Sequence, residues 1–558
     1  MRIFFLSALV LASCVGFGQK ECFTPLPNAV ERLSTDLKYL SSDKLEGRAP
    51  GEEGGNLAAY YIANQFSRLE LPGVWRGDFL QPFEVPVDAV FGIDNVLSFD
   101  ENELKLNEDY YPTRFTINGE VKGEAVYVKY GMVASEINYD DYKKLKPKKL
   151  EGKIFVMDVS SPDGIHPHSA YLKYHDLGDR ITMAKEKGAI AVVLVNMDGS
   201  ANDIAPTFKT LQSKGLPVVF VTNNEMAKKL KKAKNIDLQT EVTEKKITTY
   251  NVAAHLDNGA KKTVIIGAHY DHLGFGNRSS LAADKGKVIH NGADDNASGT
   301  AALIEIARNI AKNKEVFKAH NYVFVAFSAE EMGLLGSDYF VDSYEHIKDI
   351  KYMLNMDMVG RLEDMVLAVN GVGTSGIWRK LVEDSKCSEI KVKTSLSGVG
   401  PSDHTNFYYK DIPVLHFFTG THSDYHKPSD DFEKLNIKGE AQVVDFILQV
   451  IYKSQRHRDM LFAKTTEASS AAPKFSVTLG VMPDYMYEGE GMRIDGVNDG
   501  KPAQKAGLIT GDVVIQLGDV KVVDMMSYMK ALGQFKKGDN AKVVVKRGKE
   551  KVTKEVKF

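Results

Sequence analysis

The sequence predicts an α/β protein whose main sheet is mixed, mostly parallel and flanked by helices. From residue 249 to residue 463 the chain alternates apolar strands with helices, as in TVIIGAH followed by SGTAALIEIARNIAK and then YVFVAFS. Continuous apolar strands separated by helices are typical of parallel sheets that are covered on both faces. The remaining segments predict two smaller domains, an inserted one that is α/β or β-rich and a β-rich one at the C-terminal end.

The first residues predict an export signal. MRIFFLSALVLASCVGFGQK combines Arg2 with an apolar run that is too short to span a bilayer, followed by small residues. Two kinds of processing remain open: Leu11 to Cys14 resembles a lipobox, in which Cys14 is lipidated, whereas ordinary cleavage after Gly18 removes residues 1–18. We therefore expect a periplasmic, secreted or outer-membrane-anchored protein, which contacts a membrane only if Cys14 is lipidated.

Composition excludes some partners and leaves others open. The chain of 558 residues has a formal net charge of -3, with 26% charged residues of both signs. This balance gives no support for a nucleic-acid partner. Cys22 and Cys387 remain after cleavage at Gly18, and because two cysteines so far apart cannot be paired from sequence, they are taken as free thiols.

Changes in pattern divide a chain of this length into several domains. The predicted segments are the N-terminal part of the main domain (25–118), an insertion with short apolar strands (119–248), the core of the main domain (249–463), a polar linker (464–474) and a domain of short strands and turns (475–558). The Gly-rich stretch LEGRAPGEEGGN lacks a preceding strand and a Lys-Ser/Thr ending, so it is interpreted as a turn that leads into a helix.

Polar residues follow nearly every apolar strand of the core. They are His269 after TVIIGA, Glu330 and Glu331 after YVFVAF, Asp357 after YMLNM and His426 after IPVLHFF, and a further acidic residue, Asp295, precedes a helix. Ligands of open α/β sheets bind beyond the carboxyl ends of the strands, so these groups are expected to converge. Alone, each has a plainer explanation, such as a hydrogen-bonded core histidine or a charge at a helix N-terminus.

Five of these residues form a candidate metal site, namely His269, Asp295, Glu331, Asp357 and His426. Imidazole and carboxylate ligands suit Zn²⁺, with Mn²⁺ or Co²⁺ as substitutes. Five ligands are too many for one tetrahedral ion with an open position, but they suit two ions that share a bridging carboxylate. Asp271 is expected to accept the second ring N–H of His269.

The motifs GAHYDH, GADDNASG, FSAEEMG, NMDMVG and DYHKPSDD, in this order, resemble those of metallopeptidase family twenty-eight, the two-zinc aminopeptidases related to aminopeptidase S, aminopeptidase Y and glutamate carboxypeptidase II. The resemblance implies a zinc-exopeptidase fold and two Zn²⁺ per chain. It places His269 and Asp357 on one ion, Glu331 and His426 on the other, and Asp295 between them.

The same resemblance implies roles for residues that are not ligands. Glu330 would be the general base and acid, and Tyr425 would help to stabilise the tetrahedral intermediate. A cis peptide bond between Asp295 and Asn296 is also implied, although such a bond costs about 3 kcal/mol. Gly400-Pro-Ser-Asp403-His404 matches a loop motif near the substrate cleft of the family, so Asp403 and His404 are interpreted as residues behind the ligands or in the cleft.

The flanking domains resemble known modules. The insertion is similar to a protease-associated domain in its strand pattern and position. The C-terminal domain resembles a PDZ domain, in which Leu479, Gly480 and Val481 would form the loop that binds the carboxylate of a C-terminal peptide. A domain that only packs on the catalytic part is the alternative.

Together these features predict an exported, dinuclear zinc aminopeptidase that acts on peptides or proteins. Two alternatives remain open: carboxypeptidase, dipeptidase or glutaminyl cyclase activity on the same fold, and a peptide-binding protein without catalysis. The preferred N-terminal residue, the PDZ ligand and the oligomeric state are not predicted.

Overall fold

The computed structural model describes residues 22–465 and 477–558, apart from short gaps at residues 167–168, 198, 200, 202, 278, 283–285, 458, 485–486, 488, 499 and 536–537. The chain divides into two compact units, residues 1–81 with 250–468 and residues 82–249 with 469–558. The predicted export signal, including Cys14, and most of the predicted linker lie outside the described residues.

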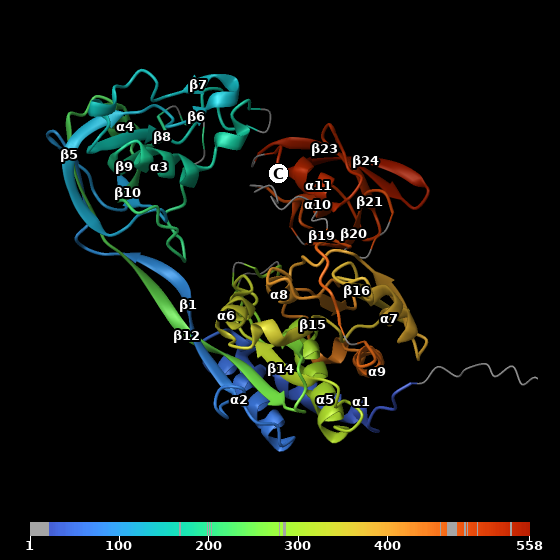
Figure 1. Ribbon diagram of the computed structural model, residues 1–558. Helices are drawn as coiled ribbons and strands as arrows, with labels where there is room; N and C mark the ends of the chain where they lie inside the picture. Colours follow the sequence, from blue (N-terminus) through green and yellow to red (C-terminus); the bar gives the residue numbers. More distant parts are fainter. Residues whose placement is uncertain are drawn as a thin grey trace, which may run out of the picture. The chain divides into compact units, whose positions relative to one another are not determined.

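The first unit is built on an eight-stranded sheet (Figure 1). Across the sheet its strands are β1 (Leu80–Phe91), β12 (Val242–Leu256), β14 (Asn321–Phe327), β13 (Thr263–His269), β15 (Ile350–Met356), β18 (Val414–Phe418), β16 (Val366–Asn370) and β17 (Lys391–Thr394). The pairs β13–β14, β13–β15, β15–β18 and β16–β17 are parallel, whereas β12–β14 and β16–β18 are antiparallel. The predicted mixed, mostly parallel sheet is confirmed.

Helices cover both faces of this sheet, because its central strands are apolar on both sides. In β13, Val264 and Ile266 pack into one cluster of buried residues and Ile265 packs into another. Helices that contribute to the first cluster are α1 (Ala29–Leu40), α2 (Glu53–Arg68), α5 (Gly299–Lys312), α7 (Trp378–Asp384) and α9 (Ile437–Ser454); α6 (Leu335–Ser343) and α8 (His404–Tyr408) contribute to the second. Among the helices of the described residues, none has the length and apolar composition that a bilayer span requires.

The second unit contains another eight-stranded sheet, which the chain enters after β1 and leaves before β12. Its strands, in order, are β3 (Asn102–Glu103), β2 (Val96–Phe99), β11 (Asn235–Thr240), β5 (Gly119–Tyr127), β8 (Lys153–Asp158), β9 (Ala189–Val195), β10 (Val218–Val221) and β4 (Tyr110–Pro112). It is accompanied by α3 (Leu177–Glu186), α4 (Asn224–Leu230) and a small ribbon of β6 (Val133–Ala134) with β7 (Tyr139–Asp140). This sheet starts before residue 119, where the insertion was predicted to begin, because β2 and β4 pair with β11 and β10.

The C-terminal residues form a smaller sheet with its own buried core. Its strands are β19 (Val481–Pro483), β20 (Met492–Val497), β21 (Val513–Leu517), β23 (Asn540–Arg547) and β24 (Glu550–Lys557), and β22 (Val520–Lys521) pairs with β21. The helices α10 (Pro502–Lys505) and α11 (Met525–Leu532) complete this part. Leu479 and Gly480 lead directly into β19, which is an edge strand.

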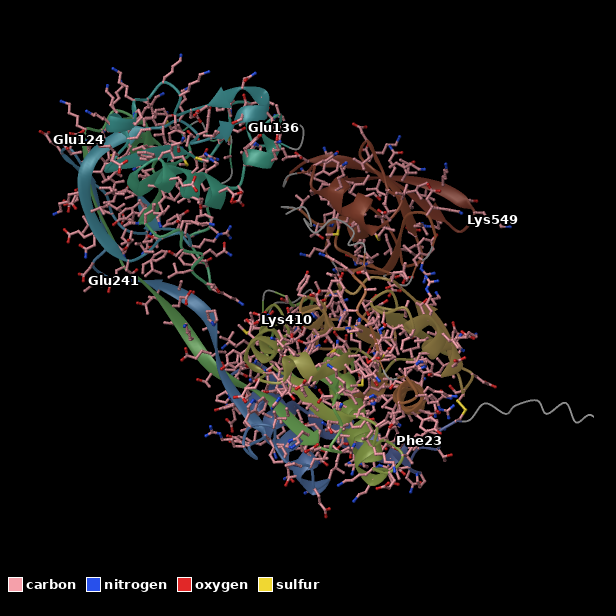
Figure 2. The ribbon with its side chains drawn as sticks, in the orientation of Figure 1. Phe23, Glu124, Glu136, Glu241, Lys410 and Lys549 are labelled. Carbon is pink, nitrogen blue, oxygen red and sulfur yellow. A yellow bond between two sulfur atoms is a disulfide. The ribbon has the colours of Figure 1, made fainter. Side chains whose placement is uncertain are left out.

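Cys22 and Cys387 form a disulfide, contrary to the prediction of free thiols, with their Cα atoms 6.2 Å apart (Figure 2). The neighbouring Phe23 explains how the N-terminal segment is held near the core. Its N–H donates to Gln449 Oε1 and its carbonyl accepts from Gln449 Nε2, both over 2.8 Å. Packing contacts across 365 residues of sequence bring the two sulfur atoms together, and no local pattern reveals them.

Candidate active site

The residues predicted to bind metal lie at the carboxyl ends of neighbouring strands. His269 is the last residue of β13, Glu331 and Asp357 follow β14 and β15, Asp295 lies in the turn before α5, and His426 lies in the loop after β18. Because β13, β14, β15 and β18 run parallel, their carboxyl ends meet at one edge of the sheet. The fold therefore brings all five side chains to the same place.

Asp295 lies between the two histidines. Its Oδ1 is 3.5 Å from His269 Nε2, and its Oδ2 is 3.2 Å from His426 Nε2. The Nε2 atom of each histidine also lies close to a second carboxylate: Asp357 Oδ1 is 3.3 Å from His269 Nε2, and Glu331 Oε2 is 3.2 Å from His426 Nε2. Asp295 therefore faces two histidine–carboxylate pairs, one with each of its oxygen atoms.

These separations fit ligands that share an ion. Two ligand atoms at the usual zinc distance of about 2.0–2.1 Å, held at a tetrahedral angle, are about 3.3 Å apart. The four N···O separations of 3.2–3.5 Å lie close to this value and exceed the length of a strong charge-assisted hydrogen bond, about 2.7–2.9 Å. The geometry and the donor atoms therefore fit two zinc ions with Asp295 as the shared ligand.

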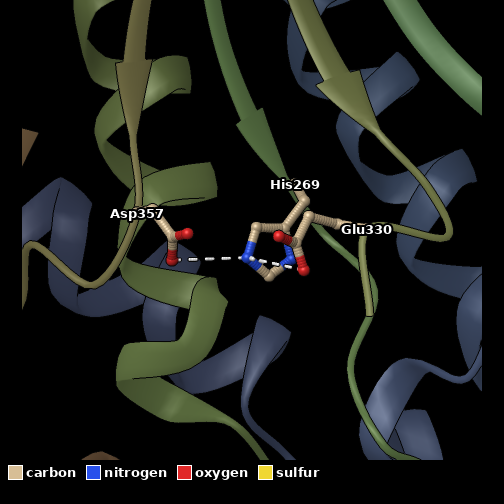
Figure 3. Close-up of side chains that lie close together, drawn as sticks. All are labelled: His269, Glu330 and Asp357. Carbon is tan, nitrogen blue, oxygen red and sulfur yellow. Dashed lines mark hydrogen bonds and ion pairs between the residues drawn. The ribbon is translucent and has the colours of Figure 1, made fainter. Parts of the chain in front are cut away.

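Glu330 forms a compact group with His269 and Asp357, but it lies farther from the His269 ring nitrogen than the other carboxylates do. Its Oε2 is 4.0 Å from His269 Nε2 (Figure 3). Burial raises the pKa of the Glu330 carboxyl well above its usual range, although the neighbouring His269 lowers it. A carboxyl group beside the ligands that readily holds a proton has the properties of a general base and acid.

Asp271 makes a different contact from the predicted one. The backbone carbonyl oxygen of Asp271 lies 3.2 Å from His269 Nδ1, whereas the nearer carboxylate oxygen lies at 3.8 Å. The carboxylate instead accepts the backbone N–H groups of Glu330 and Glu331, over 3.1 and 3.3 Å. The local turn presents the carbonyl to the ring, so the side chain of Asp271 is free to fix the directions of both glutamates.

His272 lies within the site, although no role was predicted for it from the sequence. Its Nδ1 lies 2.8 Å from Glu331 Oε1, and His272 is fully buried. Together with Asp295 and Glu331 it forms a group that is compact enough to hold a metal ion. In the sequence, its position in GAHYDH, three residues after His269, was a sign of this role. A buried carboxylate with two oxygen atoms needs more than one partner, and a neighbouring histidine can be one of them.

Backbone carbonyl groups orient both metal-facing imidazoles. His426 Nδ1 lies 3.1 Å from the carbonyl oxygen of Ser279, and His269 Nδ1 lies 3.2 Å from that of Asp271. A carbonyl can only accept a hydrogen bond, so each Nδ1 carries the proton and each Nε2 is left with its lone pair towards the carboxylates. This is the tautomer that a metal ligand requires.

Tyr425 packs against the second histidine. Its ring stacks on His426 with centroids 3.9 Å apart. Burial, together with the charges of Asp295 and Glu331, raises the pKa of the Tyr425 hydroxyl well above its ordinary value. The hydroxyl therefore keeps its proton at neutral pH and can donate a hydrogen bond towards the site.

Asp403 and His404 are completely buried at the start of α8. The His404 ring stacks on that of His416 in β18, with centroids 4.6 Å apart. Burial raises the pKa of Asp403 to about 6, while the neighbouring His269 lowers it. Among the described residues, neither side chain belongs to a group compact enough to hold a metal ion.

A second layer of charged residues supports Asp295. Asp430 Oδ2 accepts the backbone N–H groups of Asp294 and Asp295, over 3.0 and 3.1 Å, and Arg361 donates to Asp430 Oδ1 over 2.6 Å. The peptide bond between Asp295 and Asn296 is cis, as the family resemblance implied. Asp430 lies within the motif DYHKPSDD, but no contact was predicted for it from the sequence.

Left-handed backbone occurs at three residues of the site that are not glycine. The φ angles are 57° at Ala329, which precedes Glu330, 54° at Met358, which follows Asp357, and 54° at His426. Such conformations persist only where the surrounding structure imposes them, and they cluster at functional sites.

The fold and this site define an α/β domain with paired histidine–carboxylate groups that form a candidate metal centre. Comparison with known families gives the particular family: residues 251–451 match peptidase family M28, residues 121–228 match the PA domain and residues 471–558 match the PDZ domain. The chain therefore carries an M28 peptidase domain with PA and PDZ domains, and the family that the motifs resemble is confirmed.

Named relatives are aminopeptidases. The chain is 28% identical over 293 residues to aminopeptidase YwaD of Bacillus subtilis, covering 49% of this chain and 58% of that protein. It is 31% identical over 220 residues to leucine aminopeptidase 1 of Leptosphaeria maculans, covering 36% of this chain and 55% of that protein. The chain thus spans little more than half the length of these relatives.

Among solved structures, the chain resembles an aminopeptidase from Aneurinibacillus sp. strain AM-1. The identity is 23%, the coverage is 78% of this chain and 95% of that one, and the TM-score is 0.43.

Proposed function

We propose that this protein is an exported, zinc-dependent aminopeptidase that binds two zinc ions and removes N-terminal residues from peptides. The observation that carries the proposal is the Asp295 carboxylate, which faces a histidine–carboxylate pair with each oxygen at the spacing of shared zinc ligands. His269 and Asp357 would hold one ion and Glu331 and His426 the other. Zinc in such a site supplies Lewis acidity towards a water molecule and the substrate carbonyl group.

Glu330 would transfer the proton during the reaction, and Tyr425 would stabilise the developing negative charge. Glu330 lies beside the ligands, and Asp271 holds its backbone N–H, so the carboxylate of Glu330 is directed to accept a proton from water and return it to the leaving amine. The Tyr425 hydroxyl would donate to the oxygen on which negative charge develops. Neither task requires these residues to be ligands.

The charges around the site favour an aminopeptidase over a carboxypeptidase. A nearby cation favours the binding of a substrate carboxylate, yet two arginines close to the site, Arg48 and Arg361, are already engaged. Arg48 donates to backbone carbonyl oxygens, and Arg361 donates to Asp424 and Asp430. The carboxylates of Glu330 and Asp357 offer instead a negative surrounding for a substrate ammonium group.

Three versions of one peptide test the proposal: free at both ends, acetylated at the N-terminus, and amidated at the C-terminus. We expect release of the first residue from the free and amidated peptides and none from the acetylated one. The reverse pattern would indicate a carboxypeptidase, cleavage of dipeptides alone a dipeptidase, and cyclisation of N-terminal glutamine a glutaminyl cyclase. Zinc-loaded protein that releases nothing would support the binding-protein alternative.

The C-terminal domain is proposed to bind the C-terminal end of a peptide or protein. Leu479 and Gly480 lead into β19, an edge strand of its sheet that begins at Val481. An edge strand can pair with an added peptide strand, and the preceding loop can hold the terminal carboxylate. A peptide with a free carboxyl end should bind more tightly than its amide.

Export is tested by the mature N-terminus. Ordinary cleavage after Gly18 predicts a protein that begins at Gln19, whereas lipidation predicts a membrane-bound protein that begins at Cys14. An uncleaved cytoplasmic protein would contradict both forms of the proposal.

A further inference from the structure

Arg48 is a buried guanidinium whose hydrogen bonds all go to backbone carbonyl groups. The residue has no exposed surface. Its Nε donates to Tyr270 O over 2.7 Å, its Nη1 to Leu40 O and Asn291 O over 2.5 and 2.6 Å, and its Nη2 to Gly292 O over 2.9 Å. A buried charge is costly, so this arrangement calls for a reason beyond packing.

Three of the four carbonyl groups belong to the two segments that present the candidate metal ligands, and the fourth, that of Leu40, belongs to the last residue of α1. Tyr270 directly follows His269, and Asn291 and Gly292 precede the turn that carries Asp295. These segments are separated in sequence by more than 20 residues, yet one planar group bonds to both. Because the guanidinium is a rigid fork of donors, it fixes the distance between them.

The turn that presents Arg48 is conformationally strained. Glu46, Gly47 and Arg48 have φ angles of 46°, 69° and 52°, three left-handed residues in a row. A Cβ on Gly47 would lie 2.4 Å from His290 O and 2.6 Å from Gly274 O, so only glycine permits this close approach. Strain of this kind is kept only where the surroundings impose it, often at functional sites.

Arg48 also supplies a fixed positive charge to an acidic site. Burial lowers its pKa to about 10, opposed by the nearby carboxylates of Asp295, Asp271 and Asp430. The group therefore stays charged at neutral pH. A cation behind the ligands reduces the repulsion between carboxylates that zinc would otherwise have to offset alone.

We propose that Arg48 is a positioning residue of the metal site, which holds the His269 and Asp295 segments in register and thereby sets the affinity for zinc. The inference rests on the proposed function in one respect, namely that these segments carry zinc ligands. It adds that LEGR, part of the stretch interpreted from sequence as a turn that leads into a helix, belongs to the metal-binding machinery.

The test compares Arg48→Lys and Arg48→Met with a matched control, Arg180→Lys. Arg180 is also buried and also bonds to backbone carbonyl groups, those of Tyr130, Val159, Ser160 and Asp158, but it lies in the second unit. Zinc affinity is measured by competition with a chromophoric chelator, and folding by circular dichroism. We expect Arg48→Lys to bind zinc about tenfold more weakly and Arg48→Met about a hundredfold, while Arg180→Lys stays within about twofold of the wild type.

Each outcome decides the proposal. A folded Arg48→Lys protein with wild-type zinc affinity overturns it, as does a variant that stays unfolded in saturating zinc while Arg180→Lys folds. A variant that folds only when zinc is added supports it. If the wild-type protein binds no zinc, the proposed function fails instead, so the two failures are distinguishable.

Discussion

His272 donates a hydrogen bond of 2.8 Å from its Nδ1 to Oε1 of Glu331. The other oxygen of Glu331 lies 3.2 Å from His426 Nε2, within the ligand set. The first distance is shorter than the separation of about 3.3 Å expected for two ligands of one zinc ion. His272 is therefore better explained as the residue that decides which oxygen of Glu331 faces the metal than as a ligand itself.

Replacing His272 with leucine should weaken zinc binding without removing a site. We expect the affinity to fall about tenfold to a hundredfold, as for other residues that orient a ligand, while two zinc ions per chain still bind at saturation. Chelator competition measures the affinity, and metal analysis measures the stoichiometry. Loss of one ion at saturating zinc would make His272 a ligand, and an unchanged affinity would remove its orienting role.

Glu330→Gln should separate catalysis from metal binding. The amide cannot accept the proton from water, so we expect kcat to fall by a factor of about 10²–10⁴ while two zinc ions remain bound. Glu331→Gln is the matched control at the next position, and it should lower the zinc content because Glu331 lies at ligand spacing from His426. Full activity of Glu330→Gln would show that another group takes the proton.

The strand pattern predicted which residues converge, because parallel strands that end at one edge of a sheet carry His269 and Asp357 to the same place. It could not predict how each side chain divides its contacts. Whether the carbonyl or the carboxylate of Asp271 faces His269 depends on the local backbone conformation. The pattern of apolar residues carries no information about that conformation.

Contacts between distant segments were equally hidden from the sequence. Arg48 lies 222 residues before Tyr270, whose carbonyl group it binds, and Cys22 lies 365 residues before Cys387. Such pairs depend on the packed tertiary structure. The sequence does not distinguish a buried arginine in a Gly-rich turn from an exposed one, because the composition of a turn does not reveal which residues cover it.

Removing the C-terminal domain should leave peptidase activity intact if the truncation removes no residue of the first unit, which ends at Ala468. Thr465 belongs to that unit: its N–H donates to the Tyr408 hydroxyl over 3.0 Å, and its Oγ1 accepts from Gly398 N over 3.2 Å. We expect deletion of residues 469–558 to keep kcat/KM on small aminoacyl substrates within about twofold, since domains of this kind fold independently.

A protein that lacks residues 464–558 should melt at a lower temperature than the protein that lacks residues 469–558, because the longer deletion also removes the hydrogen bonds of Thr465. Thermal unfolding followed by circular dichroism compares the two truncated proteins. If the shorter deletion abolished activity without unfolding the peptidase unit, the C-terminal domain would be part of the active unit.

The buried pair of His320 and Lys351 predicts how stability depends on pH. Lys351 Nζ donates to His320 Nε2 over 2.7 Å. Burial and the adjacent Lys351 charge lower the pKa of His320 from 6.5 to about 4. Between these values the unfolded chain binds a proton that the folded protein does not, so this group makes stability fall as the pH drops from 6.5 towards 4.

His320→Gln should remove this contribution, since glutamine can still accept from Lys351 but does not titrate. We expect the melting temperature of the variant to fall less than that of the wild type between pH 6.5 and pH 4.5. Both proteins are measured without zinc, because protons compete with zinc for its ligands and the loss of zinc at low pH would also lower the melting temperature. The control is the same substitution at an exposed position, His346→Gln, where the side chain is 68% exposed. Equal slopes for wild type and His320→Gln would show that His320 titrates alike in the folded and unfolded states.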